Sequence, residues 1–360
     1  MFGGAFNPPH IEHVEVLNCA KEKLGLDFCV VFPSFLPPHK STANDIPFDT
    51  RMDMCKLAFG DVVYSNIEKE STETNYAVNT VKKFKKIYPD DQLFYIIGGD
   101  SMADLFKWYK PEELLSLVSL VVYPRQGRES DMNVAIDKAR ALGGDITVLS
   151  YVSKNFSSGE IRYLSAINSD LSKYLCPDVE KYIKDNGLYH DKCVDLARQE
   201  LSDRTYAHVL RTVEWAMVLN RKLNLPISDV FYSAILHDIT KNSNTLNGVP
   251  NDAIGSPVAH QFSGAEVAKK LGMSDAVINA VRYHTTGREN MSTLEKLVFV
   301  ADMTELGRSY EGVEKLREIL LSDFEKGFVK CLERSYEFLL EKGQNIYFLT
   351  KNAYEYYKNK

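Results

Sequence analysis

The sequence lacks the long apolar runs, cysteine pairs and basic excess that mark several large classes of protein. No apolar stretch is long enough to span a bilayer, and the first residues contain no basic segment leading into an apolar signal core. The six cysteines are scattered without a C-x-x-C pair, which is typical of reduced thiols in a cytosol. The net charge of −6 offers no general attraction to nucleic acid. We therefore expect a cytoplasmic protein that binds neither membrane nor nucleic acid.

Two kinds of pattern divide the chain near residue 190, and 360 residues are enough for two separate cores. In the first part, short apolar runs alternate with helical patterns; the runs fall at 27–33, 62–64, 93–97, 120–123 and 146–149. Strands alternating with helices predict a Rossmann-like, doubly wound parallel sheet, which is an α/β fold. From residue 191 onward the patterns are helical. The sequence therefore predicts an α/β domain at 1–190 followed by an all-α, all-helical domain at 191–360.

The first part carries a glycine-rich turn that opens into a helix with two histidines. Residues 3–13 read Gly-Gly-Ala-Phe-Asn-Pro-Pro-His-Ile-Glu-His. Gly3 and Gly4 let the backbone approach an anion, and the free N–H groups at the start of the following helix point at it. The plain alternative is a tight turn with His10 and His13 on the surface. The uncommon spacing of the prolines and histidines favours a phosphate site.

Further polar residues follow the later strands, at the edge of the sheet where ligands of such folds bind. Taken singly, each is as well explained by a helix cap, a turn or packing. Taken together, they offer cations, a carboxylate, hydroxyl groups and an aromatic face to one nucleotide. These residues are Lys40, Gly98, Asp100, Trp108, Arg125, Ser157, Ser158 and Arg162.

The opening motif resembles the G-x-F-x-P-x-H-x-G-H signature of a nucleotidyltransferase family, and residues 1–190 resemble nicotinate mononucleotide adenylyltransferase. The likeness rests also on Pro-Pro-His-Lys at 37–40, Gly-Gly-Asp at 98–100 and Ser-Ser-Gly-Glu-Ile-Arg at 157–162. It implies adenylyl transfer from ATP, bound with Mg²⁺, to nicotinate mononucleotide, with Trp108 stacked on the pyridine ring and Thr80 near its carboxylate. It implies catalytic roles for His10, His13, Lys40 and Arg162, and substrate contacts from Gly3, Gly4, Phe6, Thr80, Gly98, Asp100, Trp108, Arg125, Ser157 and Ser158.

Two departures from that pattern bear on activity. Glu12 stands where the signature has glycine, which places a negative charge next to the expected triphosphate site. Glu12 either turns away from the site or obstructs it. In addition, Met1 and Phe2 leave little of the first strand, which is central in this kind of sheet. The expectation is a start codon assigned a few codons too late.

Histidines and aspartates recur on apolar helix faces in the second part, where an unpaired polar group is costly. One such histidine is more often a satisfied core residue than a metal ligand. Four histidines and two aspartates on five helices favour metal ligands instead. Mixed imidazole and carboxylate ligands suit iron, manganese or zinc, and their number suffices for two metals that share a carboxylate. The candidates are His208, His237, Asp238, His260, His284 and Asp302.

The spacing of His208, His237-Asp238 and Asp302 is similar to that of the HD metal-dependent phosphohydrolases. The runs at 237–241, 283–288 and 301–308 resemble the HD subfamily that cleaves diadenosine tetraphosphate symmetrically to two ADP. The resemblance implies a two-metal centre, with iron expected and manganese an alternative. We expect Asp238 to bridge the metals and Lys241 to steady the charge on phosphate.

Three hypotheses follow. The first is a bifunctional enzyme that makes deamido-NAD and also hydrolyses dinucleoside polyphosphates. The second is an HD hydrolase whose N-terminal domain only binds nucleotide, because Glu12 blocks it. The third is a transferase regulated by a dinucleotide that the HD domain binds without cutting. The sequence leaves the oligomeric state and any coupling between the sites open.

Overall fold

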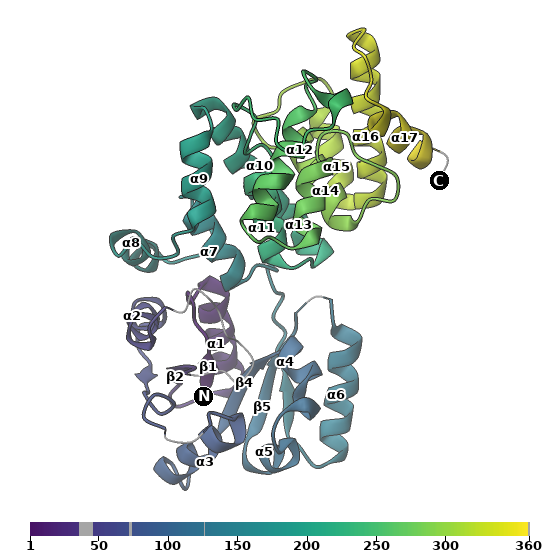
Figure 1. Ribbon diagram of the computed structural model, residues 1–360. Helices are drawn as coiled ribbons and strands as arrows, with labels where there is room; N and C mark the ends of the chain where they lie inside the picture. Colours follow the sequence, from purple (N-terminus) through teal and green to yellow (C-terminus); the bar gives the residue numbers. More distant parts are fainter. Residues whose placement is uncertain (36–45, 72–73, 126, 359–360) are drawn as a thin grey trace. The chain divides into compact units, whose positions relative to one another are not determined.

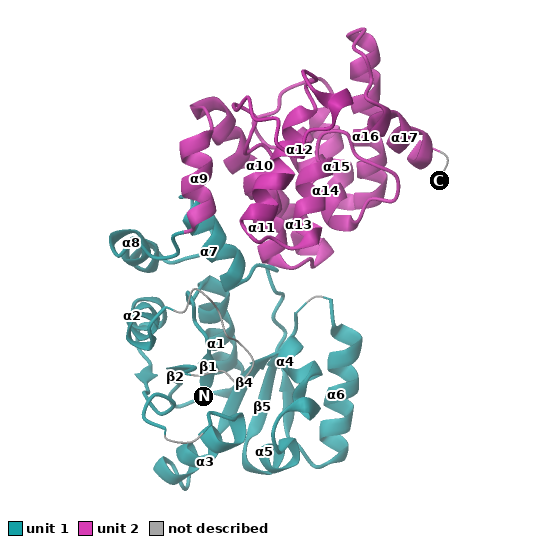
Figure 2. Ribbon diagram, viewed as in Figure 1, with its two compact units in different colours: residues 1–190 teal, residues 191–360 magenta. Residues whose placement is uncertain are grey.

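The computed structural model describes residues 1–35, 46–71, 74–125 and 127–358. Within these ranges the chain forms two compact units, Met1–His190 and Asp191–Lys360 (Figure 2). A parallel sheet with helices forms the first unit, and the regular elements described in the second unit are all helices (Figure 1). The predicted fold class, a Rossmann-like α/β domain followed by an all-helical domain, is confirmed.

The sheet of the first unit has six parallel strands among the described residues, in the order β3-β2-β1-β4-β5-β6. Phe2 on β1 lies opposite Val31 on β2 and Ile96 on β4. The strand order reverses between β1 and β4, and ligands of doubly wound sheets bind at such a reversal, beyond the carboxyl ends of the strands. The strands are β1 (Phe2–Gly4), β2 (Val30–Pro33), β3 (Val63–Tyr64), β4 (Phe94–Gly98), β5 (Ser119–Tyr123) and β6 (Ile146–Val148).

Each predicted strand run overlaps an observed strand: β4 ends one residue later than predicted, β5 begins one residue earlier, and β2, β3 and β6 are shorter than their runs. The run 62–64 yields the two-residue strand β3, because this edge strand pairs only through Val63 and Tyr64. Short as it is, β1 lies in the centre of the sheet, and it leads into the glycine-rich turn. The turn is therefore held at the strand reversal by neighbours on both sides.

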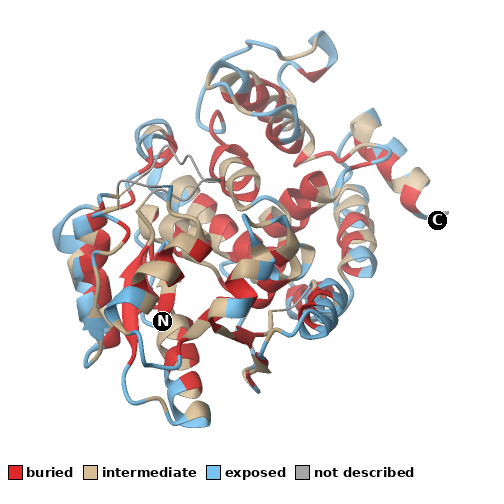
Figure 3. Cartoon of the chain, turned by 90° about the horizontal axis from the view of Figure 1, so that it is seen from below, coloured by how far each residue is buried: buried red, intermediate tan, exposed pale blue. Residues whose placement is uncertain are grey.

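Alternating side chains of the strands pack against helices on both faces of the sheet. Val31 packs with α1 and α2 on one face, whereas Val30 and Phe32 pack with α3, α5 and α6 on the other. Figure 3 shows much of the sheet as buried, with the outer faces of the helices exposed. The helices of this unit are α1 (Ile11–Leu24), α2 (Phe48–Phe59), α3 (Ala77–Ile87), α4 (Gly99–Ala103), α5 (Pro111–Leu117), α6 (Glu129–Ala141), α7 (Ser158–Ala166) and α8 (Pro177–Asp185).

The second unit packs α10 against α11 and α14, and α13 against α11, α12 and α14. Serine caps fix the starts of three of these helices: Ser202, Ser274 and Ser292 accept hydrogen bonds from backbone N–H groups in the first turn. None of the helices in the described ranges has the length and apolar character needed to cross a membrane. The helices are α9 (Lys192–Glu200), α10 (Asp203–Leu223), α11 (Ile227–Leu236), α12 (Ala259–Lys270), α13 (Asp275–Tyr283), α14 (Thr293–Thr304), α15 (Val313–Ser322), α16 (Phe324–Glu341) and α17 (Phe348–Lys358).

Candidate active site and candidate metal centre

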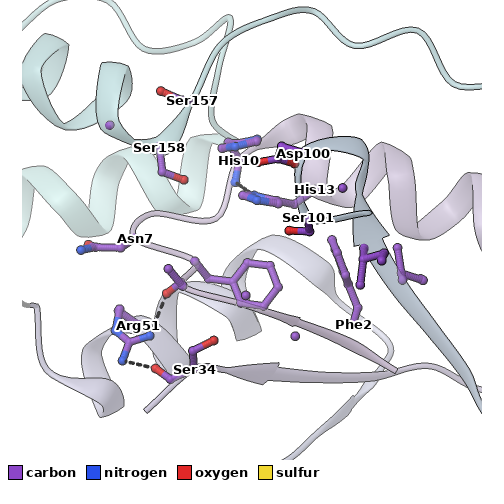
Figure 4. A pocket seen from close by; sticks show the side chains of 18 of the residues that line it. Phe2, Asn7, His10, His13, Ser34, Arg51, Asp100, Ser101, Ser157 and Ser158 are labelled. Atoms are coloured by element: carbon purple, nitrogen blue, oxygen red, sulfur yellow. Dashed lines mark hydrogen bonds between the residues drawn. The ribbon is translucent and has the colours of Figure 1, made fainter. Parts of the chain in front are cut away.

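A cavity of about 670 Å³ opens beyond the carboxyl ends of β1 and β4, in the first unit (Figure 4). The glycines keep this edge of the sheet open. A Cβ atom on Gly98 would lie 2.5 Å from Oδ1 of Asp100. The cavity brings together most of the residues that the sequence nominated for the transferase, namely Gly3, Gly4, Phe6, His10, His13, Gly98, Asp100, Trp108, Arg125, Ser157, Ser158 and Arg162.

His10 and His13 stack at the start of α1, with ring centroids 3.6 Å apart. The backbone N–H of His10 donates to Nδ1 of His13 at 3.1 Å, so the neutral His13 ring carries its proton on Nε2. Burial, with Arg125 nearby, lowers the pKa of His13 to about 3. His13 is therefore a neutral N–H donor in the cavity wall. The buried Nδ1 of His10 has no hydrogen-bond partner among the described residues.

The start of α7 closes the cavity against the opening turn. Ser157 caps α7 by accepting from the backbone N–H of Glu160 at 3.2 Å. The Ser158 hydroxyl donates to the carbonyl of Pro8 at 2.8 Å, and Arg162 Nη1 donates to the carbonyl of Asn7 at 2.7 Å. A helix N-terminus and a guanidinium thus meet the glycine-rich turn, and both can bind phosphate oxygens.

Two of the positions that the sequence singled out, Thr80 and Glu12, lie outside this lining. Thr80 is buried outside the cavity lining, because its hydroxyl donates to the carboxylate of buried Glu68 at 3.1 Å. Glu12 is also buried and absent from the lining; its carboxylate meets residues 151–154 instead. Lys40 lies outside the described residues. Of the two orientations open for Glu12, the structure has the one turned away from the site.

Arg51 on α2 lines the cavity and was not nominated from the sequence. It is buried, and its guanidinium donates to the carbonyls of Ala5 and Ser34, both at 2.7 Å (Figure 4). These bonds tie α2 to the turn after β1 and to the loop after β2. The sequence did offer one signal for this role. Arg51 lies three residues after Phe48 and four before Cys55, so helical spacing places a charged side chain on the buried face of α2.

In the second unit, the six nominated ligands converge although they come from five helices. His208, His260 and Asp302 lie within α10, α12 and α14. The rest directly follow helices: His237 and Asp238 come after α11, and His284 after α13. Their ligand atoms form three overlapping triads, and within each triad the ligand atoms lie within 4.8 Å of one another. The triads are His208, His237 and Asp238; His237, His284 and Asp302; and Asp238, His260 and His284.

Three of the four imidazoles present unprotonated nitrogens to this centre. Nδ1 of His237, His260 and His284 each lies 2.7 to 2.8 Å from the carbonyl three residues earlier, so each Nδ1 carries the proton. Their Nε2 atoms are then lone-pair donors. Nε2 of His260 lies 3.2 Å from Nε2 of His284, and the donors beside this pair are the Thr285 hydroxyl, 3.0 to 3.2 Å from both nitrogens, and Lys241 Nζ, 3.0 Å from His260. The donor set therefore fits metal ions.

The carboxylates of the centre are ionised. Burial alone would raise the pKa of Asp238, but the surrounding imidazoles hold it well below its ordinary value. Oδ1 of Asp238 lies 3.1 Å from Nε2 of His260 and 3.4 Å from Nε2 of His284. Burial also lowers the pKa of His237 to about 4, which keeps that ring neutral. Anionic carboxylates and a neutral His237 are protonation states that metal binding requires. His208 differs, because its contacts with Asp302 and Glu305 outweigh burial and raise its pKa.

Glu305 supports the centre from outside and was missed in the sequence. Its buried carboxylate accepts from Nε of Arg211 at 2.6 Å and lies 3.1 Å from Nδ1 of His208. Among the four imidazoles, His208 is thus the one whose Nδ1 faces a carboxylate rather than a backbone carbonyl. The one sequence signal for this contact was that Glu305 is an acidic residue three positions after Asp302, close to it along the chain.

Basic residues differ in their distance from the centre. Lys241 Nζ lies 3.0 Å from Nε2 of His260, and Arg308 donates to Oδ1 of Asp302 at 2.7 Å. Arg282 and Arg288 are paired elsewhere, with Glu266 and Glu295. Lys241 and Arg308 are therefore the cations placed to meet a phosphate at the centre.

Residues 1–164 match the cytidylyltransferase-like family model, and residues 205–307 match the HD domain model. The first match covers the sheet and the cavity at its strand reversal, and the second covers the helices that carry the His/Asp cluster. The chain thus joins a nucleotidyltransferase-type domain to an HD domain.

Relatives of the first domain narrow the class. A probable nicotinate-nucleotide adenylyltransferase from Geobacter sulfurreducens is 32% identical over 212 residues, covering 53% of this chain and 98% of the relative. The nicotinate-nucleotide adenylyltransferase of Bacillus subtilis is 34% identical over 197 residues, covering 52% and 96%. The chain belongs to the nicotinate-nucleotide adenylyltransferase family.

A solved structure described as a "predicted HD superfamily hydrolase involved in NAD metabolism", from Clostridium acetobutylicum, is 27% identical and covers 47% of this chain and 96% of its own, with a TM-score of 0.41.

The lowered pKa and fixed hydrogen bond of His13 make a spectroscopic prediction for the free protein. A pKa of about 3 means that the ring releases its proton far below pH 5. Imidazole nitrogen NMR, with the signal assigned by loss in His13→Asn, should therefore show one neutral form, protonated on Nε2, from pH 5 to pH 8. A titration midpoint near the ordinary histidine value of about 6.5 would contradict this.

Glu305→Gln should weaken metal binding, because the glutamine keeps an oxygen for His208 but loses the charge that makes the imidazole a stronger ligand. The expected loss is about tenfold or more, measured by competition with a chelator for added Mn²⁺. Exposed Glu311→Gln is the matched control. An unchanged affinity in a variant with wild-type melting temperature would remove Glu305 from the metal site.

Proposed function

We propose that residues 1–190 transfer the adenylyl group of ATP to nicotinate mononucleotide, giving deamido-NAD and pyrophosphate. The observation that carries the proposal is the paired His10 and His13 in a cavity at the strand reversal, in a chain that belongs to this transferase family. The cavity walls supply donors for phosphate and an aromatic ring, Trp108, for a base or pyridine.

The proposed reaction needs no nucleophilic side chain. A phosphate oxygen of the mononucleotide forms a bond to the α-phosphorus of ATP, and the bond from that phosphorus to the pyrophosphate oxygen breaks. Catalysis is then positioning and stabilisation of charge. His13 donates its Nε2 proton as a hydrogen bond to the α-phosphate, without giving it up, since its neutral form is the stable one. His10, Arg162 and Lys40 meet the remaining oxygens, and ATP arrives as its Mg²⁺ complex.

The orientation of Glu12 supports an active transferase over a domain that only binds nucleotide. Obstruction would need the carboxylate to face the cavity. Glu12 is 3% exposed, and its Oε1 accepts from the Ser153 hydroxyl at 2.9 Å, away from the lining. The negative charge of Glu12 is thus already hydrogen-bonded within the protein, without ATP in the cavity.

We infer that the HD domain is a metal-dependent phosphohydrolase that cuts diadenosine tetraphosphate symmetrically. Its His/Asp cluster supports the hydrolase class, and the sequence resemblance of the runs around His237, His284 and Asp302 supports the substrate. Water oxygen bonds to a phosphorus and the central P–O–P bridge breaks, giving two ADP. Bound divalent metals, iron or manganese, would activate that water and offset phosphate charge.

The chain's own residues orient the proposed hydrolysis. Asp238 reaches towards both His237 and the His260–His284 pair, so its two oxygens suit it to bridge metals. Lys241, whose side chain is 43% exposed, stands beside His260 and Asp238, where its ammonium group is placed to meet a substrate phosphate. Arg308 holds Asp302 from the other side and offers a second cation.

His13→Ala should lower kcat for adenylyl transfer at least about a hundredfold, the usual scale for one preorganised donor. Pyrophosphate release from ATP and nicotinate mononucleotide measures it. Exposed Asn18→Ala on the same helix is the control and should behave as wild type. A His13→Ala enzyme with near-wild-type kcat would remove His13 from the mechanism, and a wild type that forms no dinucleotide would overturn the transferase assignment.

Asp238→Ala should abolish hydrolysis of diadenosine tetraphosphate and reduce bound metal, because it removes the carboxylate shared by two of the ligand triads. Adenylyl transfer should stay within about twofold of wild type, since the two units have separate cores. Nucleotide chromatography and elemental analysis measure both effects, with exposed Asp275→Ala as control. Wild-type protein that binds neither iron nor manganese and leaves the dinucleotide intact would refute the hydrolase.

A further inference from the structure

Glu12 lies on α1 between the two cavity histidines, yet it belongs to a different contact. Its Oε1 accepts from the Ser153 hydroxyl at 2.9 Å and the Tyr151 hydroxyl at 3.4 Å, and also from the backbone N–H of Lys154. The side chain is 3% exposed. A buried carboxylate that accepts several hydrogen bonds is held more strongly than a neutral acceptor would be.

Glu15, one turn further along α1, meets the same segment. Its Oε2 accepts from the Tyr151 hydroxyl at 2.8 Å, and its Oε1 pairs with Nζ of Lys154 at 2.5 Å. Residues 12 and 15 face the same side of a helix because they are three apart. Two carboxylates on one face of α1 therefore hold residues 151–154, which we call the latch segment.

The latch segment connects β6 to α7, and α7 forms one wall of the cavity. Ser153 also accepts from the backbone N–H of Asn155 at 3.1 Å, which fixes the turn before α7. Directly after this turn come Ser157 and Ser158, and then Arg162, which bonds the carbonyl of Asn7. The position of the latch segment thus sets where the serines and Arg162 stand.

We propose that Glu12 is a positioning residue of the transferase site, which anchors the latch segment so that the start of α7 is ordered before ATP binds. The proposal rests on the proposed function of residues 1–190. Without the carboxylate, the Ser153 hydroxyl and the Lys154 amide lose a shared buried partner, and the segment loosens. Binding ATP must then order the segment, which weakens binding more than it slows the chemical step.

Two measurements on the full-length protein test this. In Glu12→Ala, hydrogen exchange of the amides at 151–157 should accelerate about tenfold or more, the loss expected for a hydrogen bond to a charged group. KM and Kd for ATP should rise about fivefold or more, whereas kcat should change less than about twofold. Glu12→Gln keeps an oxygen acceptor and should restore most of the protection and affinity. Exposed Glu22→Ala, on the same helix, should match wild type in both measurements.

The outcomes separate this proposal from the proposed function. Unchanged exchange at 151–157 in Glu12→Ala overturns the latch, and so does an unchanged Kd for ATP by calorimetry. A rise in kcat in Glu12→Gly also overturns it, because that result means obstruction. Exchange and calorimetry need no turnover, so they decide the role of Glu12 even if wild-type protein makes no deamido-NAD, a result that would overturn the transferase alone.

Discussion

The group that faces Nδ1 of His13, and of three histidines in the second unit, sets what each of these side chains can do, and both candidate sites depend on it. In the first unit, Nδ1 of His13 accepts a backbone N–H, so Nε2 is a hydrogen-bond donor suited to phosphate. In the second unit, Nδ1 of His237, His260 and His284 faces a backbone carbonyl, so Nε2 is a lone-pair donor suited to metal. Histidine thus acts as a hydrogen-bond donor in one unit and as a lone-pair donor in the other, and the main-chain atom that faces Nδ1 determines which.

Burial stabilises the neutral form of these imidazoles, so that the tautomer set by the local hydrogen bond persists. A solvent-exposed imidazole near neutral pH exchanges between protonated and neutral forms, and its tautomer is only weakly held. Burial lowers the pKa values of His13 and His237 far enough that the neutral form persists, and the local hydrogen bond then fixes one tautomer. The fold contributes the rest: a strand reversal places His13 at a cavity, and packing of five helices gathers the metal ligands.

Much of this was predictable from sequence because the signals are local. Apolar runs predicted the strands after β1, and polar residues on apolar helix faces predicted the cluster of candidate ligands. The remainder depends on partners distant in the chain. The direction of Glu12 is decided by Ser153 and Lys154, more than a hundred residues later. Glu305 acquires its role only through His208, 97 residues earlier, so no window of sequence contains both.

A main-chain partner does not depend on which side chain its own residue carries, which makes most of these contacts independent of the neighbouring side chains. A backbone carbonyl or N–H is present whatever the side chain, so three of the four metal-facing imidazoles keep their tautomer as long as the helix ends keep their shape. His208 is the exception, because its Nδ1 faces the carboxylate of Glu305. A charged partner makes a more electron-rich ligand than a carbonyl does. The candidate centre is therefore unequal: His208 alone of its four imidazoles has carboxylates facing both ring nitrogens, Glu305 at Nδ1 and Asp302 at Nε2, and these contacts raise its pKa against the effect of burial.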